Sequence, residues 1–309
     1  MQHTTKPIDL RIAIVLLVCG ITGGSVFILV KALVGEVTAL QLVAARVLLA
    51  AAVVGTVMVM GGRTPRFSRS LLFGATVLAL SDAIIPYVLI ALAAPHVRAS
   101  TSALLVATMP LFTAAFVSVT DRTRLEPQTL AGLALGVVGA AILAGPKALD
   151  FADSATLAMF AVLLSAASYA ASAVYSRVVL READPIGLSA VKFAIASLII
   201  VPFVATREGF TSFSGLSAEG WLGLLGIGCF ATGLARCGYV WVIAEAGSVA
   251  ASLLTYIVPA AAMVLGWLFL HETPGASAIL GAVAVAAAVT CVLRGVSPSS
   301  PERSRSPRA

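Results

Sequence analysis

Four ionisable side chains lie within long apolar stretches of this sequence, and their types and spacing make them the first candidates for chemistry. They are Arg46, Asp82, Lys192 and Arg236. An ionisable residue in the middle of a membrane-spanning helix costs roughly 2.5–3.5 kcal/mol on insertion, so each needs a specific reason to be there. Arg46 and Lys192 either border a polar pathway across the membrane or tie helices together by donating to carbonyl groups or to a carboxylate on another helix.

Asp82 and Arg236 have the most specific chemistry of the four. Because a guanidinium stays charged in any environment, Arg236 is a candidate for holding a substrate carboxylate. Asp82 would then accept a substrate ammonium or carry a proton. The alternative is a resting ion pair between Asp82 and Arg236 that closes or packs the interior. A pair that opens for substrate would satisfy both interpretations.

Aromatic residues and prolines add to the candidate site. Tyr169 and Tyr256 lie deep enough in apolar stretches to line a cavity. Pro110 and Pro259 each remove a helix hydrogen bond, which predicts kinks that serve either as gates or as fixed bends. Glu272 follows an apolar stretch and is interpreted as a gate, as a helix cap or as a solvated residue.

Other kinds of chemistry find no candidates in the sequence. The four cysteines fall within apolar stretches and form no CxxC or Cys/His pattern, so we expect no disulfide framework and no metal site. The three histidines lie outside the apolar stretches, and no Walker A, HExxH or GxSxG motif is present. We therefore expect neither an enzyme nor a bound cofactor.

The composition requires lipid as the solvent for most of the chain. Of the 309 residues, 60% are hydrophobic and 11% are charged, and the mean hydropathy is +1.03. A soluble globular protein is roughly 45–50% apolar and about 25% charged. The apolar runs lack the alternation of barrel strands, which predicts an all-α polytopic membrane protein with ten transmembrane helices. The expected spans are 12–30, 39–60, 71–93, 101–119, 128–145, 155–176, 186–204, 220–243, 249–270 and 276–293.

The distribution of basic residues predicts the orientation of these spans. Of the 20 Lys and Arg residues, thirteen fall on the side of the N-terminus, four on the opposite side and three inside spans. This bias places both termini in the cytoplasm, so the net charge of +6 reports topology and not nucleic-acid binding. The segment 297–309 is rich in Ser, Pro and Arg and is expected to be a disordered basic tail near anionic lipid headgroups.

The second half of the chain repeats landmarks of the first half. One set is displaced by 146 positions and the next by 149. The matching landmarks are Lys31, Glu36 and Arg46 with Arg177, Glu182 and Lys192, then Leu104, Leu105, Pro110 and Gly132 with Leu253, Leu254, Pro259 and Gly281. Five spans in each half place the second copy upside down in the membrane, as in many secondary transporters. We expect two repeats, 1–147 and 148–296, and note that Asp82 and Arg236 are not repeated.

The order of these landmarks resembles that of the EamA-type permeases of the drug/metabolite transporter superfamily. In that family the fourth span of each half carries a proline, followed by a loop with an acidic residue and a glycine-rich fifth span. The second half matches with Pro259, Glu272 and Gly281. The basic residues Arg46 and Lys192 of each half's second span are also similar to the family pattern.

The first half departs from the family pattern at one position. It has Pro110 and Gly132, but Thr123 stands where the spacing places the acidic residue, and Asp121 and Glu126 flank it. A role for the first-half acid is therefore in doubt. The resemblance otherwise covers nearly the whole chain, and it implies a bacterial inner-membrane permease with a central cavity between the halves, often an exporter of amino acids or other small metabolites.

Three classes of function are compared on these grounds. We expect a secondary transporter that works by alternating access on a small-molecule substrate in a lipid membrane. The alternatives are a non-transporting membrane scaffold or partner subunit, which would not need deep unrepeated charges, and an efflux protein for drugs or toxic compounds. Glycines of the first and fifth spans predict close helix packing within the monomer, with a homodimer face as the alternative. The substrate, the direction of net transport and proton coupling are left open by the sequence.

Overall fold

Helices make up every regular element in the part of the chain that the structure describes. This computed structural model describes residues 9–144 and 152–295, apart from residues 64, 66, 124, 181 and 274. Within these residues, nine helices are long and apolar enough to cross a membrane, and a tenth apolar helix, Pro127–Leu143, is shorter. Their ends lie within four residues of the predicted spans, which confirms the all-α prediction. The predicted tail, 297–309, lies outside the described residues.

The first half of the chain contributes seven α-helices and one π-helical segment. They are α1 (Leu10–Leu33), α2 (Ala39–Met60), α3 (Arg69–Ala79), η1 (Leu80–Ile84), α4 (Ile85–Ala93), α5 (Ala99–Val106), α6 (Met109–Thr120) and α7 (Pro127–Ala144). The π-helical segment η1 joins α3 to α4, so the three elements form one continuous span.

The second half follows a similar order. Its elements are α8 (Ser154–Val179), α9 (Pro185–Arg207), the short 3-10 helix η3 (Thr211–Gly215), α10 (Ala218–Leu225), η4 (Gly226–Leu234), α11 (Ala235–Ser252), α12 (Leu254–Leu270) and α13 (Ala276–Gly295). The π-helical segment η4 joins α10 to α11 as η1 joins α3 to α4. Displacing η1 by either 146 or 149 positions places it within η4. π-Helical turns of this kind occur frequently at functional sites.

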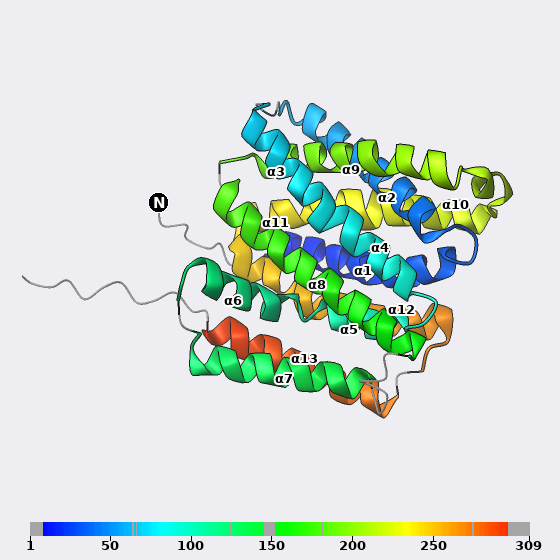
Figure 1. Cartoon of the computed structure of the whole chain (residues 1–309). Coiled ribbons are helices and arrows are strands. Elements are labelled where there is room, and N and C mark those ends of the chain that lie inside the picture. Colours follow the sequence, from blue (N-terminus) through cyan, green and yellow to red (C-terminus); the bar gives the residue numbers. More distant parts are fainter. Residues whose placement is uncertain are drawn as a thin grey trace, which may run out of the picture.

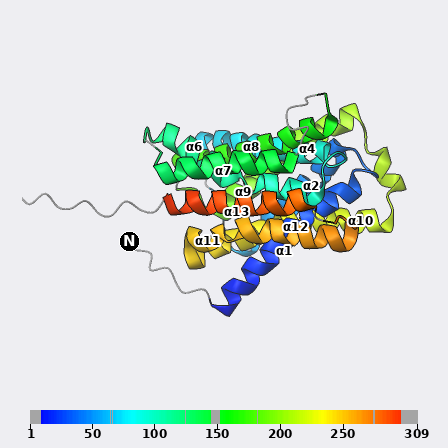
Figure 2. The ribbon, with the colours of Figure 1, turned by 90° about the horizontal axis from the view of Figure 1, so that it is seen from below.

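Helices from the two halves pack against each other in matching pairs (Figures 1 and 2). α2 packs against α9 and α7 against α13, while α1 packs against α12 as α8 packs against α6. α1 begins and α13 ends at the same end of the bundle, and α1 leads away from that end whereas α8 leads back toward it (Figure 1). We call this the Arg177 end and the opposite one the Lys31 end, after the residues near the ends of α8 and α1.

Close approach between the halves depends on glycine. A Cβ at Gly24 of α1 would lie 2.8 Å from the backbone nitrogen of Ala262 in α12. A Cβ at Gly132 of α7 would lie 2.8 Å from the carbonyl oxygen of Ala288 in α13. Both contacts fall below any normal carbon–oxygen or carbon–nitrogen separation, so these glycines serve helix packing within the monomer, as the sequence predicts.

The two prolines, for which the sequence predicts kinks, differ in their relation to helix interruptions. Pro110 is the second residue of α6, and the helix is interrupted just before it, between α5 and α6. Pro259 lies inside the continuous helix α12. Gly247, whose φ of 83° is non-helical, lies between the spans Ala218–Gly247 and Ala250–Leu270 and turns one into the next. Within the span that contains Pro259, the interruption lies at Leu253, six residues before the proline.

Candidate functional site

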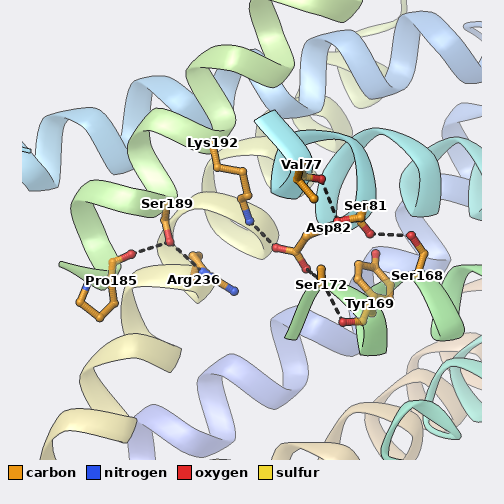
Figure 3. A network of polar contacts seen from close by, with 10 residues as sticks. All are labelled: Val77, Ser81, Asp82, Ser168, Tyr169, Ser172, Pro185, Ser189, Lys192 and Arg236. Carbon is orange, nitrogen blue, oxygen red and sulfur yellow. Dashed lines mark hydrogen bonds and ion pairs between the residues drawn. The ribbon is translucent and has the colours of Figure 1, made fainter. Parts of the chain in front are cut away.

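An ion pair between Lys192 and Asp82 lies in the interior of the bundle (Figure 3). The Nζ of Lys192, in α9, lies 2.5 Å from Oδ2 of Asp82, in η1. The Lys192 side chain is only 2% exposed, whereas that of Asp82 is 20% exposed. The hydroxyl of Ser172, in α8, lies 3.3 Å from the other carboxylate oxygen of Asp82. Asp82 is therefore held from two helices and still reachable by solvent-sized molecules.

Arg236 does not form the ion pair with Asp82 that the sequence offered as one alternative. Its Nε donates to the hydroxyl of Ser189 at 3.0 Å, and that hydroxyl in turn donates to the carbonyl of Pro185 at 2.7 Å. Lys192 pairs with the Asp82 carboxylate instead of Arg236. Ser189, which binds Arg236, lies three residues before Lys192 on the same face of α9. Arg236 forms no ion pair with a carboxylate among the described residues.

Arg46 reaches the other π-helical segment. Its Nε donates to the hydroxyl of Thr232, in η4, at 2.8 Å, and Thr232 donates to the carbonyl of Ile227 five residues earlier. The guanidinium carbon of Arg46 lies 3.6 Å from the ring centroid of Tyr87, a cation–π contact. Tyr87 and Tyr169 are neighbours, with ring centroids 6.4 Å apart.

These residues form a closed sequence of contacts that we call the polar ring. Neighbours in the ring are joined either by the contacts above or by a spacing of three or four residues on one helix. Its members are Arg46, Asp82, Tyr87, Tyr169, Ser172, Ser189, Lys192, Thr232 and Arg236. Within the described residues, no three His, Cys, Asp or Glu side chains gather as a metal site.

The ring has an internal symmetry that follows the sequence repeat. Arg46, in the first half, bonds to η4 of the second half, and its counterpart Lys192 bonds to η1 of the first half. Each half's second span thus places a cation against the π-helical segment of the other half. Asp82 and Arg236 are unrepeated, and both belong to the ring.

Tyr256, the remaining residue expected to line the site, lies elsewhere. It borders an apolar cavity of about 220 Å³ between α5, α12 and α13, together with Leu104, Pro259 and Val285. Its hydroxyl lies 3.2 Å from that of Thr290. The structure therefore brings Asp82, Arg236 and Tyr169 together and separates Tyr256 from them.

Glu272 forms a contact between the halves at the Lys31 end. Its Oε1 lies 2.8 Å from Nζ of Lys31 and accepts from the backbone nitrogen of Ala99 at 3.2 Å. The Glu272 side chain is 9% exposed and that of Lys31 is 28% exposed. Nearby, Arg98 donates to the carbonyl of Thr273 at 3.0 Å. We call the Lys31–Glu272 pair the first latch.

A corresponding contact lies at the Arg177 end. Arg177, the repeat counterpart of Lys31, pairs with both carboxylate oxygens of Asp121 at 2.9 and 3.0 Å, and we call this pair the second latch. Arg122 and His271 occupy repeat-related positions and share a left-handed conformation, with φ of 53° and 52°. Asp121 precedes this turn in the first half, whereas Glu272 follows it in the second. Asp121 thus supplies the carboxylate that is missing at Thr123.

Sequence reasoning missed three members of the ring, Ser172, Ser189 and Thr232, and among the aromatic residues it favoured Tyr169 and Tyr256 over Tyr87. Single hydroxyl residues in apolar spans are common, so their residue types carried no signal of their own. A signal was available in the spacing, since Ser189 precedes Lys192 by three residues and Thr232 precedes Arg236 by four. The partner of Arg236 thus lies one turn from Lys192, and the partner of Arg46 lies one turn from Arg236.

The fold and the ring define a class of protein. Long apolar helices that enclose a set of charged and hydroxyl side chains are the architecture of a multi-pass membrane protein with a functional interior. The sequence profile of the EamA-like transporter family matches residues 10–145 and again residues 156–294. The chain belongs to this family.

Individual relatives agree with the family assignment. An uncharacterized transporter, YoaV, of Bacillus subtilis (strain 168) is 26% identical over 189 residues, which cover 61% of this chain and 64% of that protein, slightly less than two thirds of its length. An uncharacterized transporter of Archaeoglobus fulgidus is 25% identical over 215 residues, covering 69% and 73%. A solved crystal structure shares the fold at a TM-score of 0.62 and 17% identity, covering 91% of this chain and 96% of that one.

Proposed function

We propose that this chain is a secondary transporter that exports small metabolites across a bacterial inner membrane by alternating access around the polar ring. The observation that carries the proposal is the ring itself, because it gathers deep charges of both halves at the two π-helical segments. A scaffold subunit would have no use for the unrepeated Asp82 and Arg236, each of which is costly within an apolar bundle.

An inverted repeat of two five-span halves supports the alternating mechanism. The family profile matches twice, beginning at residues 10 and 156, and α1 and α8 run in opposite directions (Figure 1). The paired packing of α1 with α12 and of α8 with α6 follows the same relation. Two such halves that rock against each other open a site at their junction to either side in turn.

Substrate binding is assigned to the side chains of the ring that have free hydrogen-bonding groups. Arg236 uses only its Nε within the ring, so its terminal nitrogens hold a substrate carboxylate, as in amino acids and related metabolites. Asp82 is paired with Lys192 and becomes available to a substrate ammonium or a proton only if that pair opens. Tyr169 provides an aromatic wall beside them.

The latches close the two ends of the pathway in turn. With both termini in the cytoplasm, the first latch lies on the outer side and the second on the cytoplasmic side. In this structure Glu272 of the first latch is nearly buried, whereas the side chains of Arg177 and Asp121 are 47% and 39% exposed. Glu272 therefore acts as the outer gate of a conformation that is more firmly closed toward the outside.

The test is transport by the purified chain in proteoliposomes loaded with metabolites from an export screen. Arg236→Ala is expected to lower the initial rate about tenfold or more, because it removes a charge-assisted contact to the substrate. Arg207→Ala is the matched control, since Arg207 is an exposed arginine at the end of α9. Unchanged transport by a folded Arg236→Ala protein would contradict the proposal.

A further inference from the structure

The charges of the polar ring are unbalanced. The ring holds three basic residues, Arg46, Lys192 and Arg236, and a single acidic one, Asp82. Asp82 is occupied by Lys192 at 2.5 Å. Two arginine charges are left without a carboxylate partner among the described residues.

Arg236 directs its guanidinium into the ring. Figure 3 shows the group pointing away from Ser189 and toward the region of Asp82 and Ser172. The terminal nitrogens of Arg236 form no hydrogen bond with a described residue. Every described side-chain nitrogen that is buried from solvent has a hydrogen-bond partner, so these nitrogens are not buried from solvent. The planar fork of Arg236 is thus free to bind a carboxylate through two parallel hydrogen bonds.

Arg46 is the second uncompensated cation. It is buried, with Nε bonded to Thr232 and its guanidinium stacked on Tyr87, and neither partner carries a charge. The two positive groups are held at different members of the ring, Arg46 at Thr232 of η4 and Arg236 at Ser189 of α9.

Such an excess of positive charge selects the charge of the ligand. Two cations in an apolar bundle are stabilised by a ligand that brings two negative charges. A neutral zwitterion leaves the excess in place, and an organic cation increases it. A small dicarboxylate matches the number of arginines that have no carboxylate partner among the described residues.

We propose that the substrate is a small dicarboxylate anion bound between Arg46 and Arg236, while Lys192 keeps Asp82 neutralised. This inference rests on the proposed transport function and narrows its substrate class. It distinguishes the site from one for zwitterionic amino acids, in which Asp82 would leave Lys192 to hold the substrate ammonium.

The test compares four probes of similar size and different charge in proteoliposomes that contain the full chain. The probes are succinate, glutamate, alanine and choline. Succinate is expected to enter fastest and, in detergent, to raise the thermal stability of the protein more than the other three. Preference for glutamate over succinate would assign Asp82 to an ammonium and overturn the proposal, as would preference for alanine or choline.

Variants of the ring test the role of charge directly. Arg236→Gln is expected to lower succinate uptake about tenfold or more, and Arg236→Lys, which keeps the charge, to retain the preference for succinate at a reduced rate. Arg207→Gln is the control for loss of one exposed charge. If succinate neither enters nor stabilises the folded protein, the proposal is overturned. The transport function falls only if an export screen in cells also finds no metabolite whose release depends on Arg236.

Discussion

At the scale of single residues, the Lys192–Asp82 pair explains how the bundle tolerates its most deeply buried charge. Lys192 is almost completely enclosed, and the adjacent carboxylate offsets the cost of its burial together with a cation–π contact, in which Nζ lies 4.2 Å from the ring centroid of Phe193. Removing one partner of a buried pair is more costly than removing both, because it leaves an uncompensated charge in an apolar environment.

This relation predicts the stability of variants of the pair. Asp82→Asn is expected to lower the free energy of unfolding by on the order of 3 kcal/mol, and adding Lys192→Met is expected to recover much of the loss. The measurement is the apparent melting temperature in detergent micelles. Asp121→Asn, which removes one partner of an exposed pair, is the control and should cost at most about 1 kcal/mol. A double variant less stable than Asp82→Asn would contradict the role of the pair.

The sequence predicted which deep residues matter better than it predicted their partners. Apolar surroundings alone identify Arg46, Asp82, Lys192 and Arg236, since each stands out by its cost. The partner of Asp82 depends on how α9 and α11 are rotated about their axes, and the two helices present Lys192 and Arg236 to the same region. Spacing along the chain does not determine that rotation. This explains why the sequence offered a pair of Asp82 with Arg236, and why it predicted a carboxylate partner for Lys192 as one alternative without naming Asp82.

At the scale of elements, the latches connect helix ends of one half to loops of the other. Glu272 joins the end of α1 through Lys31 and the start of α5 through the Ala99 amide. Asp121 makes the corresponding connection to Arg177 at the end of α8. Loss of either latch should therefore loosen one end of the bundle and leave the other unchanged.

Hydrogen exchange tests this expectation for the first latch. Glu272→Gln is expected to speed exchange of the first-turn amides of α5 about fivefold, because it weakens a tie of on the order of 1 kcal/mol. The charge-swapped pair Lys31→Glu with Glu272→Lys should not restore protection, because an ammonium at position 272 cannot accept a hydrogen bond from the Ala99 amide. Glu219→Gln changes an exposed acid at the start of α10 and serves as the control. Equal effects of Glu219→Gln and Glu272→Gln would rule out a latch.

Spans were predictable from the sequence, but the interruptions within them were not. Apolar runs located the helices to within four residues because hydrocarbon imposes both length and composition. The π-helical segments η1 and η4 have no comparable signal, since an extra residue in a turn changes no hydropathy. The sequence also did not show which neighbouring residue would take the place of the acid that is missing at Thr123. Asp121 is the residue at the end of α6, two positions before Thr123, and from there it pairs with Arg177.

At the scale of the whole molecule, the described contacts between the halves differ at the two ends of the bundle. At the Lys31 end, Thr38 donates to Glu208 at 2.5 Å, and Gln41 donates to the carbonyl of Gly209 at 3.0 Å, in addition to the first latch. At the Arg177 end, the described ion pairs are Arg177–Asp121 and Arg63–Asp184, and both are exposed. Among the residues that the structure describes, the ion pair between the halves at the Lys31 end is thus nearly buried on its acidic side, whereas those at the Arg177 end are exposed.

The repeat was readable from the sequence as a set of displaced landmarks. Its physical consequence, a second-span cation from each half placed against the π-helical segment of the other, required the packing of α2 against α9. Local patterns cannot predict that contact because it joins residues more than a hundred positions apart. Composition and charge nevertheless gave the class of protein and a proposed orientation.

The central claim is that the two ends open in turn, and spin-label distances across both ends test it most directly. In a chain with its four native cysteines replaced by serine, one label pair is placed at Gly35 and Ser277, at the Lys31 end. A second pair is placed at Thr120 and Val179, at the Arg177 end. Addition of the transported substrate in liposomes should lengthen one distance and shorten the other. Distances that both stay fixed, or that change in the same direction, would contradict alternating access.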